Sequence, residues 1–401
     1  MAWAKISDLI LNLNSAYFSN TTYMNLKELI DITVTPYLPQ SLIDKKAIQR
    51  INSIAQDLPE QITSFFGFEC RLGNKKPVAD FLFCIFKDSY GHDILNNSDN
   101  QNSLLPQKWM NHSIWKNIIR FVKKWDENMD HLWLEFDIQE NEGESIPIPS
   151  FFFAPIDSTN GIFLRREESF KTIIKGLLIV KAGKIEELIQ KQIYNVVMTL
   201  PDDAYIFQVG TMLSRSEQVY RLCIRDIEGP QIVSFLAKMN WIGNLGILSE
   251  LINELYTYVD RIDLDVDINT QIGPKIGLEC YLNMDDQRSH RWKHFLSYLA
   301  DRGLCTDEKE EALVGLEGYV HQGECEQYPE HLIQMLGFIG SKYMSVYLRD
   351  IHHIKIDFLD SSILEAKAYL RVKHIWVSRS NLFEAAKQSQ LTKVQEQYDN
   401  I

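Results

Sequence analysis

Five pairs of short segments along the chain alternate between apolar and polar residues, and each pair follows one or two stretches with helical periodicity. Alternation with a period of two predicts β-strands, whereas apolar residues three and four positions apart predict amphipathic helices. A turn joins the members of each pair, which predicts antiparallel hairpins. The predicted hairpins are 67–71 with 80–86, 132–138 with 150–153, 205–211 with 219–226, 262–268 with 275–282, and 353–358 with 366–372.

The recurrence of this unit predicts stacked repeats that share one core. Ten sequential antiparallel strands can close into a barrel, which removes both sheet edges, and the helices can then form an outer ring. The predicted fold is therefore α+β: a ten-stranded antiparallel β-barrel with a polar lumen inside a ring of α-helices, in one domain spanning residues 1–401. The five ααββ repeats fall at approximately 24–88, 107–155, 166–228, 229–284 and 288–378, and 379–401 is a C-terminal helix or tail.

Charged residues occupy the polar face of several predicted strands. In 262–268, Asp263, Asp265 and Asp267 alternate with aliphatic residues. If the helices cover the apolar face, the charged face cannot be outer surface, so it must line a wet central chamber.

Composition limits the classes of function. The formal charge of −13 argues against a nucleic-acid partner, because phosphate backbones demand a basic surface. No run of about twenty apolar residues predicts a membrane span. The six cysteines form no CxxC pair, which favours reduced thiols, and the N-terminus has no signal-peptide pattern. These features predict a cytoplasmic protein.

Two strands carry local motifs within this pattern: Gly67-Phe68-Glu69-Cys70-Arg71-Leu72 and Ala366-Lys367-Ala368-Tyr369-Leu370. With the five repeats, they resemble the aromatic prenyltransferases of the ABBA or PT-barrel family, over roughly residues 24–378. The resemblance implies transfer of an isoprenyl group from an allylic diphosphate to an aromatic acceptor, such as an indole, Trp or Tyr, free or within a peptide natural product.

The resemblance also implies roles for lumen-facing residues. Cations must neutralise the departing diphosphate, aromatic faces must shield the allylic cation, and a carboxylate must take the acceptor proton. The candidate bases are Glu69, with Glu135 and Glu279 in reserve. The candidate diphosphate ligands are Arg71, Arg221, Arg225, Lys275, Lys355, Lys367 and Arg371. The candidate shielding residues are Trp133, Tyr281 and Tyr369.

The predicted lumen departs from the family pattern in its many carboxylates. Only Lys367-Ala368-Tyr369 keeps the family's Lys-x-Tyr motif, and no metal ligands are assigned. A calcium loop at Asp263 is excluded, since Ile268 and Pro274 replace its glycine and bidentate acid. No cofactor is required, and Mg²⁺ stays open. Two alternatives also stay open: a cofactor-independent peptide-modifying acid/base enzyme of natural-product biosynthesis on the same barrel, and a non-catalytic peptide-binding barrel.

Overall fold

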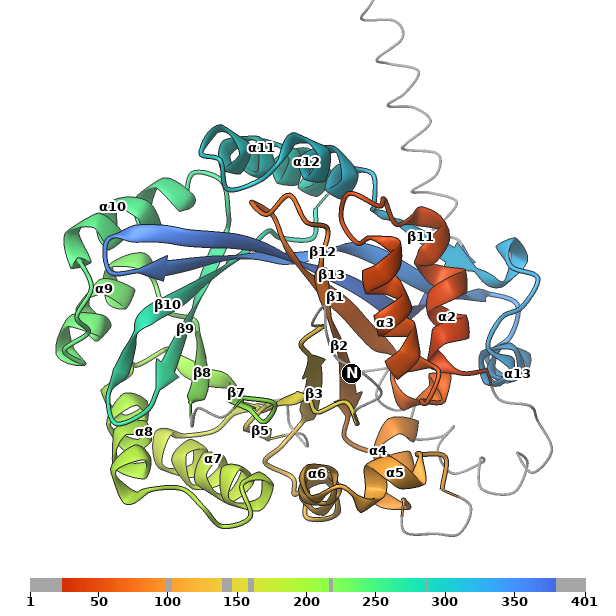
Figure 1. The fold of residues 1–401 in the computed structure, drawn as a ribbon, viewed down its shortest axis with the longest axis horizontal. Coiled ribbons are helices and arrows are strands. Elements are labelled where there is room, and N and C mark those ends of the chain that lie inside the picture. The colour runs from red at the N-terminus through yellow and green to blue at the C-terminus, as the bar shows by residue number, and fades with distance from the viewer. Residues whose placement is uncertain are drawn as a thin grey trace, which may run out of the picture.

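Ten strands form a closed antiparallel barrel, as the alternating pattern predicts (Figure 1). Their order around the barrel is β10-β9-β8-β7-β4-β3-β2-β1-β13-β12, and β12 pairs with β10 to close it. This computed structural model describes residues 24–98, 103–138, 146–157, 162–215, 219–285 and 287–379. The barrel strands are β1 (Phe65–Arg71), β2 (Ala79–Phe86), β3 (His131–Phe136), β4 (Ser150–Phe153), β7 (Tyr205–Met212), β8 (Tyr220–Arg225), β9 (Arg261–Ile268), β10 (Ile272–Tyr281), β12 (Tyr343–Leu359) and β13 (Ser362–Ser378).

Helices surround this barrel, and two or three α-helices precede each hairpin (Figure 1). Their ends carry recognisable caps: the Asn25 side chain accepts a hydrogen bond from the Glu28 backbone N–H, and Asp44 accepts one from that of Ala47. The helices are α2 (Leu26–Thr33), α3 (Lys45–Ala55), α4 (Tyr90–Asn96), α5 (Gln107–Asn111), α6 (Ser113–Lys123), α7 (Arg166–Val180), α8 (Glu187–Thr199), α9 (Gly229–Lys238), α10 (Leu245–Leu255), α11 (Arg288–Asp301), α12 (Asp307–Val314) and α13 (Glu330–Ile339).

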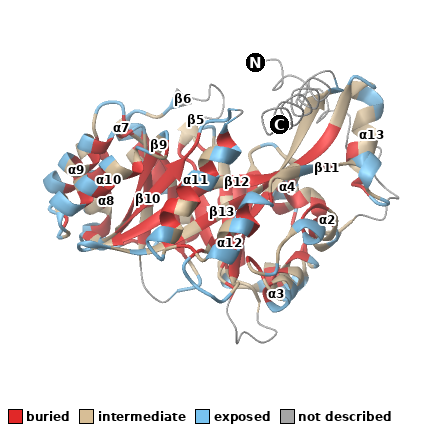
Figure 2. Cartoon of the chain, turned by 90° about the horizontal axis from the view of Figure 1, so that it is seen from above, coloured by how far each residue is buried: buried red, intermediate tan, exposed pale blue. Residues whose placement is uncertain are grey.

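The hydrophobic core lies between the barrel and the helical ring, where Figure 2 shows buried strands and the inner faces of the helices. On β3, Leu132 and Leu134 are buried in this core, whereas Trp133 and Glu135 on the opposite face are only partly buried. The apolar residues of each strand therefore pack against the helices, and the polar residues that alternate with them face the lumen.

The last hairpin is longer than its sequence pattern predicts. Both β12 and β13 extend beyond the barrel, where β12 also pairs with β11 (Gly318–His321). A separate two-stranded sheet joins β5 (Ile156–Asp157) to β6 (Ile162–Phe163). Neither β11 nor this small sheet was predicted. The predicted tail, apart from Arg379, lies outside the described residues.

No helix in the described part of the chain combines the length and the apolar composition that a membrane span requires.

Candidate active site

The barrel encloses a cavity of about 310 Å³ whose wall combines aromatic rings with charged side chains. Trp133, Tyr281 and Tyr369, predicted from alternation alone, all line it. The Tyr369 ring stacks on His353, with centroids 4.3 Å apart, and Trp133 meets Phe65 edge-on at 4.7 Å. The rings of His352 and Tyr281 connect these two pairs, so the aromatic residues form a continuous part of the wall.

Two of the three predicted carboxylates line the cavity, and the third forms a hydrogen bond with a residue of the cavity wall. Glu135 and Glu279 belong to the wall, and Tyr281 Oη donates a hydrogen bond of 2.6 Å to Glu279. Glu69 is not part of the cavity wall. It accepts a hydrogen bond from the hydroxyl of Tyr369, and Tyr369 does line the cavity. Glu69 can therefore orient Tyr369 without touching a ligand in the cavity.

The surroundings shift the pKa values of Glu69 and Glu135 in opposite directions. Burial alone would raise the pKa of Glu69, but Lys367, 3.1 Å away, and the Tyr369 hydroxyl outweigh it and lower the pKa to about 2. Burial, reinforced by the negative charge of Glu69, raises the pKa of Glu135 to about 8. Glu69 is thus a fixed anion, whereas Glu135 exchanges its proton near neutral pH.

Every cation predicted to bind diphosphate forms an ion pair with a carboxylate. Arg221, Arg225, Lys355 and Arg371 line the cavity, whereas Arg71, Lys275 and Lys367 do not. The pairs are Arg71 with Asp80, Arg221 with Asp267, Arg225 with Asp263, Lys275 with Asp357, Lys355 with Asp265, Lys367 with Glu69, Asp357 and Glu365, and Arg371 with Asp350. Arg225, Lys355 and Arg221 thus engage the strand aspartates 263, 265 and 267, although one carboxylate oxygen of Asp265 keeps no hydrogen-bond partner.

Two carboxylates, Asp263 and Asp350, each pair with two arginines, of which one lines the cavity, so positive charge exceeds negative charge within these pairs. Asp263 accepts hydrogen bonds from Arg225 at 2.8 Å and from Arg261 at 3.0 Å. Asp350 likewise serves two guanidinium groups, those of Arg371 and of Arg288, the latter at 2.7 Å. Two aspartates therefore balance only half the charge of four arginines.

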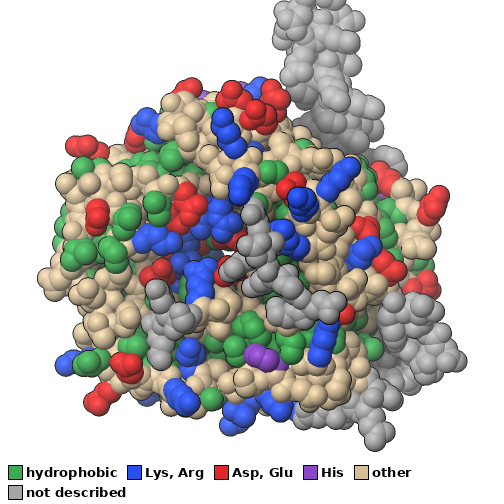
Figure 3. Space-filling view, viewed as in Figure 1, with side chains coloured by type: hydrophobic (Ala, Val, Ile, Leu, Met, Phe, Trp, Pro, Cys, Tyr) green, Lys and Arg blue, Asp and Glu red, His purple; other side chains and the backbone are tan. Residues whose placement is uncertain are grey.

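Lys373 adds a further positive charge to this region. It lines the cavity with its ammonium group 5.4 Å from the centre of the Phe65 ring. Among the described residues, no carboxylate forms an ion pair with it. Burial and then the nearby charge of Arg371 lower its pKa. In Figure 3, lysine and arginine side chains gather around the central hollow of the molecule.

The cationic side chains converge on His352. Burial, His353, and then the charges of Arg371, Arg225 and Arg288 hold the pKa of His352 well below its usual value. Arg225 and Arg371 line the cavity together with His352, whereas Arg288 lies outside the wall and donates a hydrogen bond to the backbone oxygen of Ile351. An anion placed there would meet several donors at once.

Sequence reasoning missed several residues of the wall, for two different reasons. Lys373 continues the alternation of Lys367, Tyr369 and Arg371 on β13, so a longer predicted strand would have found it. Strict alternation along a strand would place the adjacent residues His352 and His353 on opposite faces. A register shift between Ile351 and His353 instead places both in the cavity wall, with their Nδ1 atoms 2.8 Å apart.

No protein-family model and no curated protein sequence matches this chain. Several solved structures resemble its fold, and two of them serve as examples. One is 5-dimethylallyl tryptophan synthase from Streptomyces coelicolor, in complex with DMASPP and Trp, at 10% identity over 87% of this chain and 92% of that chain, with a TM-score of 0.47. The other is AnaPT from Neosartorya fischeri, at 10% identity over 92% of this chain and 96% of that one, with a TM-score of 0.46. At this identity and structural similarity, an assignment of activity depends on the cavity itself.

Proposed function

We propose that this protein is an aromatic prenyltransferase of the ABBA type. One observation carries the proposal: an aromatic cavity whose cationic side chains exceed their carboxylate partners around His352. Excess positive charge favours an anionic group such as a diphosphate, and aromatic faces favour both an isoprenyl chain and an aromatic acceptor. The acceptor is an aromatic small molecule or an aromatic residue of a peptide.

The residues divide between the steps of the reaction. Arg225, Arg371 and Lys373 bind the diphosphate as the allylic C–O bond breaks and pyrophosphate leaves with the electron pair. Tyr281 and Tyr369 shield the resulting cation. The acceptor carbon or nitrogen then forms the new bond, and its proton passes to Glu135, which lies in the cavity wall. Glu69 positions Tyr369 in this scheme, so Glu135 replaces it as the preferred base.

The other predicted cations have a supporting role in this proposal. Lys275 and Lys367 share Asp357, at 3.3 Å and 3.4 Å, and Lys367 also contacts Glu69. When one partner of such a buried ion pair is removed, the other is left as an uncompensated buried charge. Arg71, Arg221, Lys275, Lys355 and Lys367 therefore hold the lumen carboxylates in place, and contact with diphosphate is left to the other cations.

The first experiment measures turnover directly. The protein is incubated with dimethylallyl or geranyl diphosphate and a panel of indoles and of peptides containing Trp or Tyr, with and without Mg²⁺, and the products are read by mass spectrometry. A gain of one prenyl unit by an acceptor is the expected result. No gain with any pair of substrates counts against the proposal.

A second experiment tests the donor site without requiring turnover. Affinity for an unreactive thiolodiphosphate analogue is measured by calorimetry for wild type, Lys373→Met and Lys275→Met. Loss of a charged contact typically costs about 1.5–3 kcal/mol, so Lys373→Met should weaken binding by about 10- to 100-fold. Lys275 lies outside the cavity wall and its partner Asp357 keeps Lys367, so its substitution should change affinity little. Equal losses in both variants would contradict the assignment.

The pairing of all seven predicted cations favours a second candidate function, an acid/base enzyme acting on a peptide. In that case the neutral Glu135 would transfer protons within a chamber that binds no diphosphate. The thiolodiphosphate measurement separates the two candidates, because only the prenyltransferase needs to bind the analogue.

A further inference from the structure

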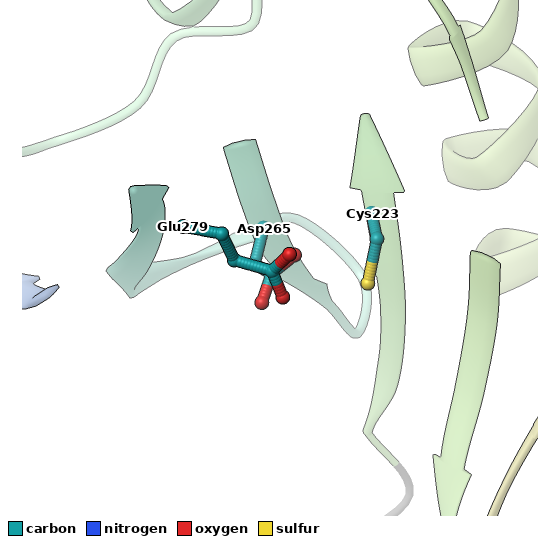
Figure 4. Close-up of side chains that lie close together, drawn as sticks. All are labelled: Cys223, Asp265 and Glu279. Atoms are coloured by element: carbon teal, nitrogen blue, oxygen red, sulfur yellow. The ribbon is translucent and has the colours of Figure 1, made fainter. Parts of the chain in front are cut away.

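Three potential metal ligands meet on neighbouring strands in the middle of the barrel. Cys223 on β8 lies opposite Asp265 on β9, and β9 in turn pairs with β10, which carries Glu279. The thiol and one oxygen from each carboxylate all lie within 4.8 Å of one another, and all three residues are buried. Figure 4 shows the two carboxylate groups together, with the thiol on the adjacent strand.

A fourth ligand type lies beside them. His353 Nε2 is 3.8 Å from Glu279 Oε1, and His353 is only 6% exposed. This nitrogen is buried and has no hydrogen-bond partner, and the same is true of Asp265 Oδ1. Buried polar atoms without partners are rare, since each loses its hydration without compensation. A metal ion would give both atoms a partner.

The charges at this place favour a further cation. Asp265 and Glu279 are adjacent buried carboxylates, and the ammonium group of Lys355 contacts Asp265. One ammonium cannot balance two carboxylates at this depth. A divalent ion together with Lys355 would balance three anionic ligands, namely the two carboxylates and a thiolate, with neutral His353 as the fourth ligand.

The surrounding residues already orient the four side chains. Tyr281 Oη donates to Glu279 at 2.6 Å, and Lys355 fixes Asp265. The Nδ1 atoms of His352 and His353 are 2.8 Å apart, which directs His353 Nε2 away from His352. Hydrogen bonds to the outer atoms of ligating residues are typical of protein metal sites.

We propose that Cys223, Asp265, Glu279 and His353 form a binding site for a divalent transition metal of the Zn²⁺, Co²⁺ or Fe²⁺ class. A thiolate and an imidazole distinguish this site from one for Mg²⁺ or Ca²⁺, which prefer oxygen ligands alone. Binding forms the sulfur–metal bond and breaks the S–H bond of Cys223, whose proton passes to solvent. Ligand atoms in a tetrahedral zinc site lie roughly 3.5 Å apart, so the Cys223, Asp265 and Glu279 atoms close by about 1 Å. His353 lies outside that group of three, next to Glu279, and its side chain must move further toward the ion.

The four residues also line the central cavity, so a bound ion would face any ligand there. This proposal does not depend on prenyl transfer. A metal site could serve either candidate function by binding an anionic oxygen.

The test uses Co²⁺ as a spectroscopic probe of the full chain after chelator treatment. We expect a sulfur-to-cobalt charge-transfer band in the near ultraviolet and intense visible bands of tetrahedral Co²⁺, both displaced by one equivalent of Zn²⁺. Cys223→Ser should lose the charge-transfer band. Cys84→Ser, which alters another cysteine of the same cavity wall, should keep it.

Zn²⁺ affinity gives a second readout. His353→Asn and Glu279→Gln should each weaken Zn²⁺ binding by more than about 100-fold, because loss of even an outer partner costs about 10- to 100-fold. Circular dichroism of each variant checks folding. If Cys223→Ser does not fold, the charge-transfer band of wild type and the His353→Asn affinity decide the question. A wild-type protein that binds neither metal, or a charge-transfer band that survives in Cys223→Ser, would overturn the proposal.

Discussion

Two glutamates in one barrel differ in charge state because their partners differ. Glu69 has an ammonium group and a phenol hydroxyl beside it, whereas none of the described cations forms an ion pair with Glu135. A base is most effective when its pKa is near the working pH. At the scale of single residues, Glu135 therefore fits the role of proton acceptor better than Glu69.

This assignment predicts a pH profile for turnover. With the pKa of Glu135 at about 8, the ionised base accumulates as pH rises toward and past that value, and turnover should rise with it. Glu135→Gln should lower kcat by about 10²- to 10⁴-fold and leave thiolodiphosphate affinity unchanged. Glu250→Gln, on the exposed face of α10, is the matched control. A profile that is flat between pH 6 and about 9 would assign the proton to another group.

The same carboxyl group predicts a pH-dependent difference in stability. The pKa of Glu135 is raised from 4.5 to about 8 on folding, so its contribution is fully present below the lower value and is lost as pH rises toward the higher one. Gln cannot ionise and avoids this loss. The Tm of Glu135→Gln minus that of wild type should therefore increase between pH 4.5 and about 8, and should be constant at higher pH. A constant difference between pH 4.5 and about 8, measured by differential scanning calorimetry, would show that folding does not raise the pKa of Glu135.

At the scale of elements, strand alternation predicted the barrel well, but its irregularities could not be read from the pattern. The alternation of β9 identified Asp263, Asp265 and Asp267 as lumen residues because the strand is regular. In β12 a register shift changes which face His352 occupies, and no spacing in the sequence signals it. Ion pairing was also beyond prediction, since partners such as Lys355 and Asp265 lie 90 positions apart.

The junction of β1 with β13 gives a prediction about packing. A Cβ atom at Gly67 would lie 2.0 Å from the backbone oxygen of Leu370 on β13, so a side chain there forces the strands apart. Gly67→Ala should destabilise the protein by about 3 kcal/mol, at the upper end for overpacking. Gly337→Ala in α13 meets no atom within 4 Å and should be neutral or stabilising by up to about 1 kcal/mol. Urea unfolding of both variants tests the contrast; similar midpoints would contradict it.

At the scale of the whole molecule, closure makes the five repeats depend on one another. β1, near the start of the described chain, pairs with β13, near its end, and β10 pairs with β12. Loss of any hairpin would expose two strand edges and uncover part of the helical ring. The sequence predicted this closure from strand number and order alone. The positive region of the cavity arises instead from shared aspartates, a three-dimensional relation that a net charge of −13 does not suggest.

Closure also predicts a single unfolding transition for the predicted single domain. Buried tryptophans report on different sectors of the ring: Trp115 in α6, Trp241 after α9, and Trp292 in α11. After labelling with 5-fluorotryptophan, their native ¹⁹F signals, assigned by Trp→Phe substitution, should disappear at the same urea concentration, because no sector keeps its core once the barrel opens. If the Trp115 signal were lost at lower urea than that of Trp292, the repeats would unfold separately, and the chain would contain at least two independent units.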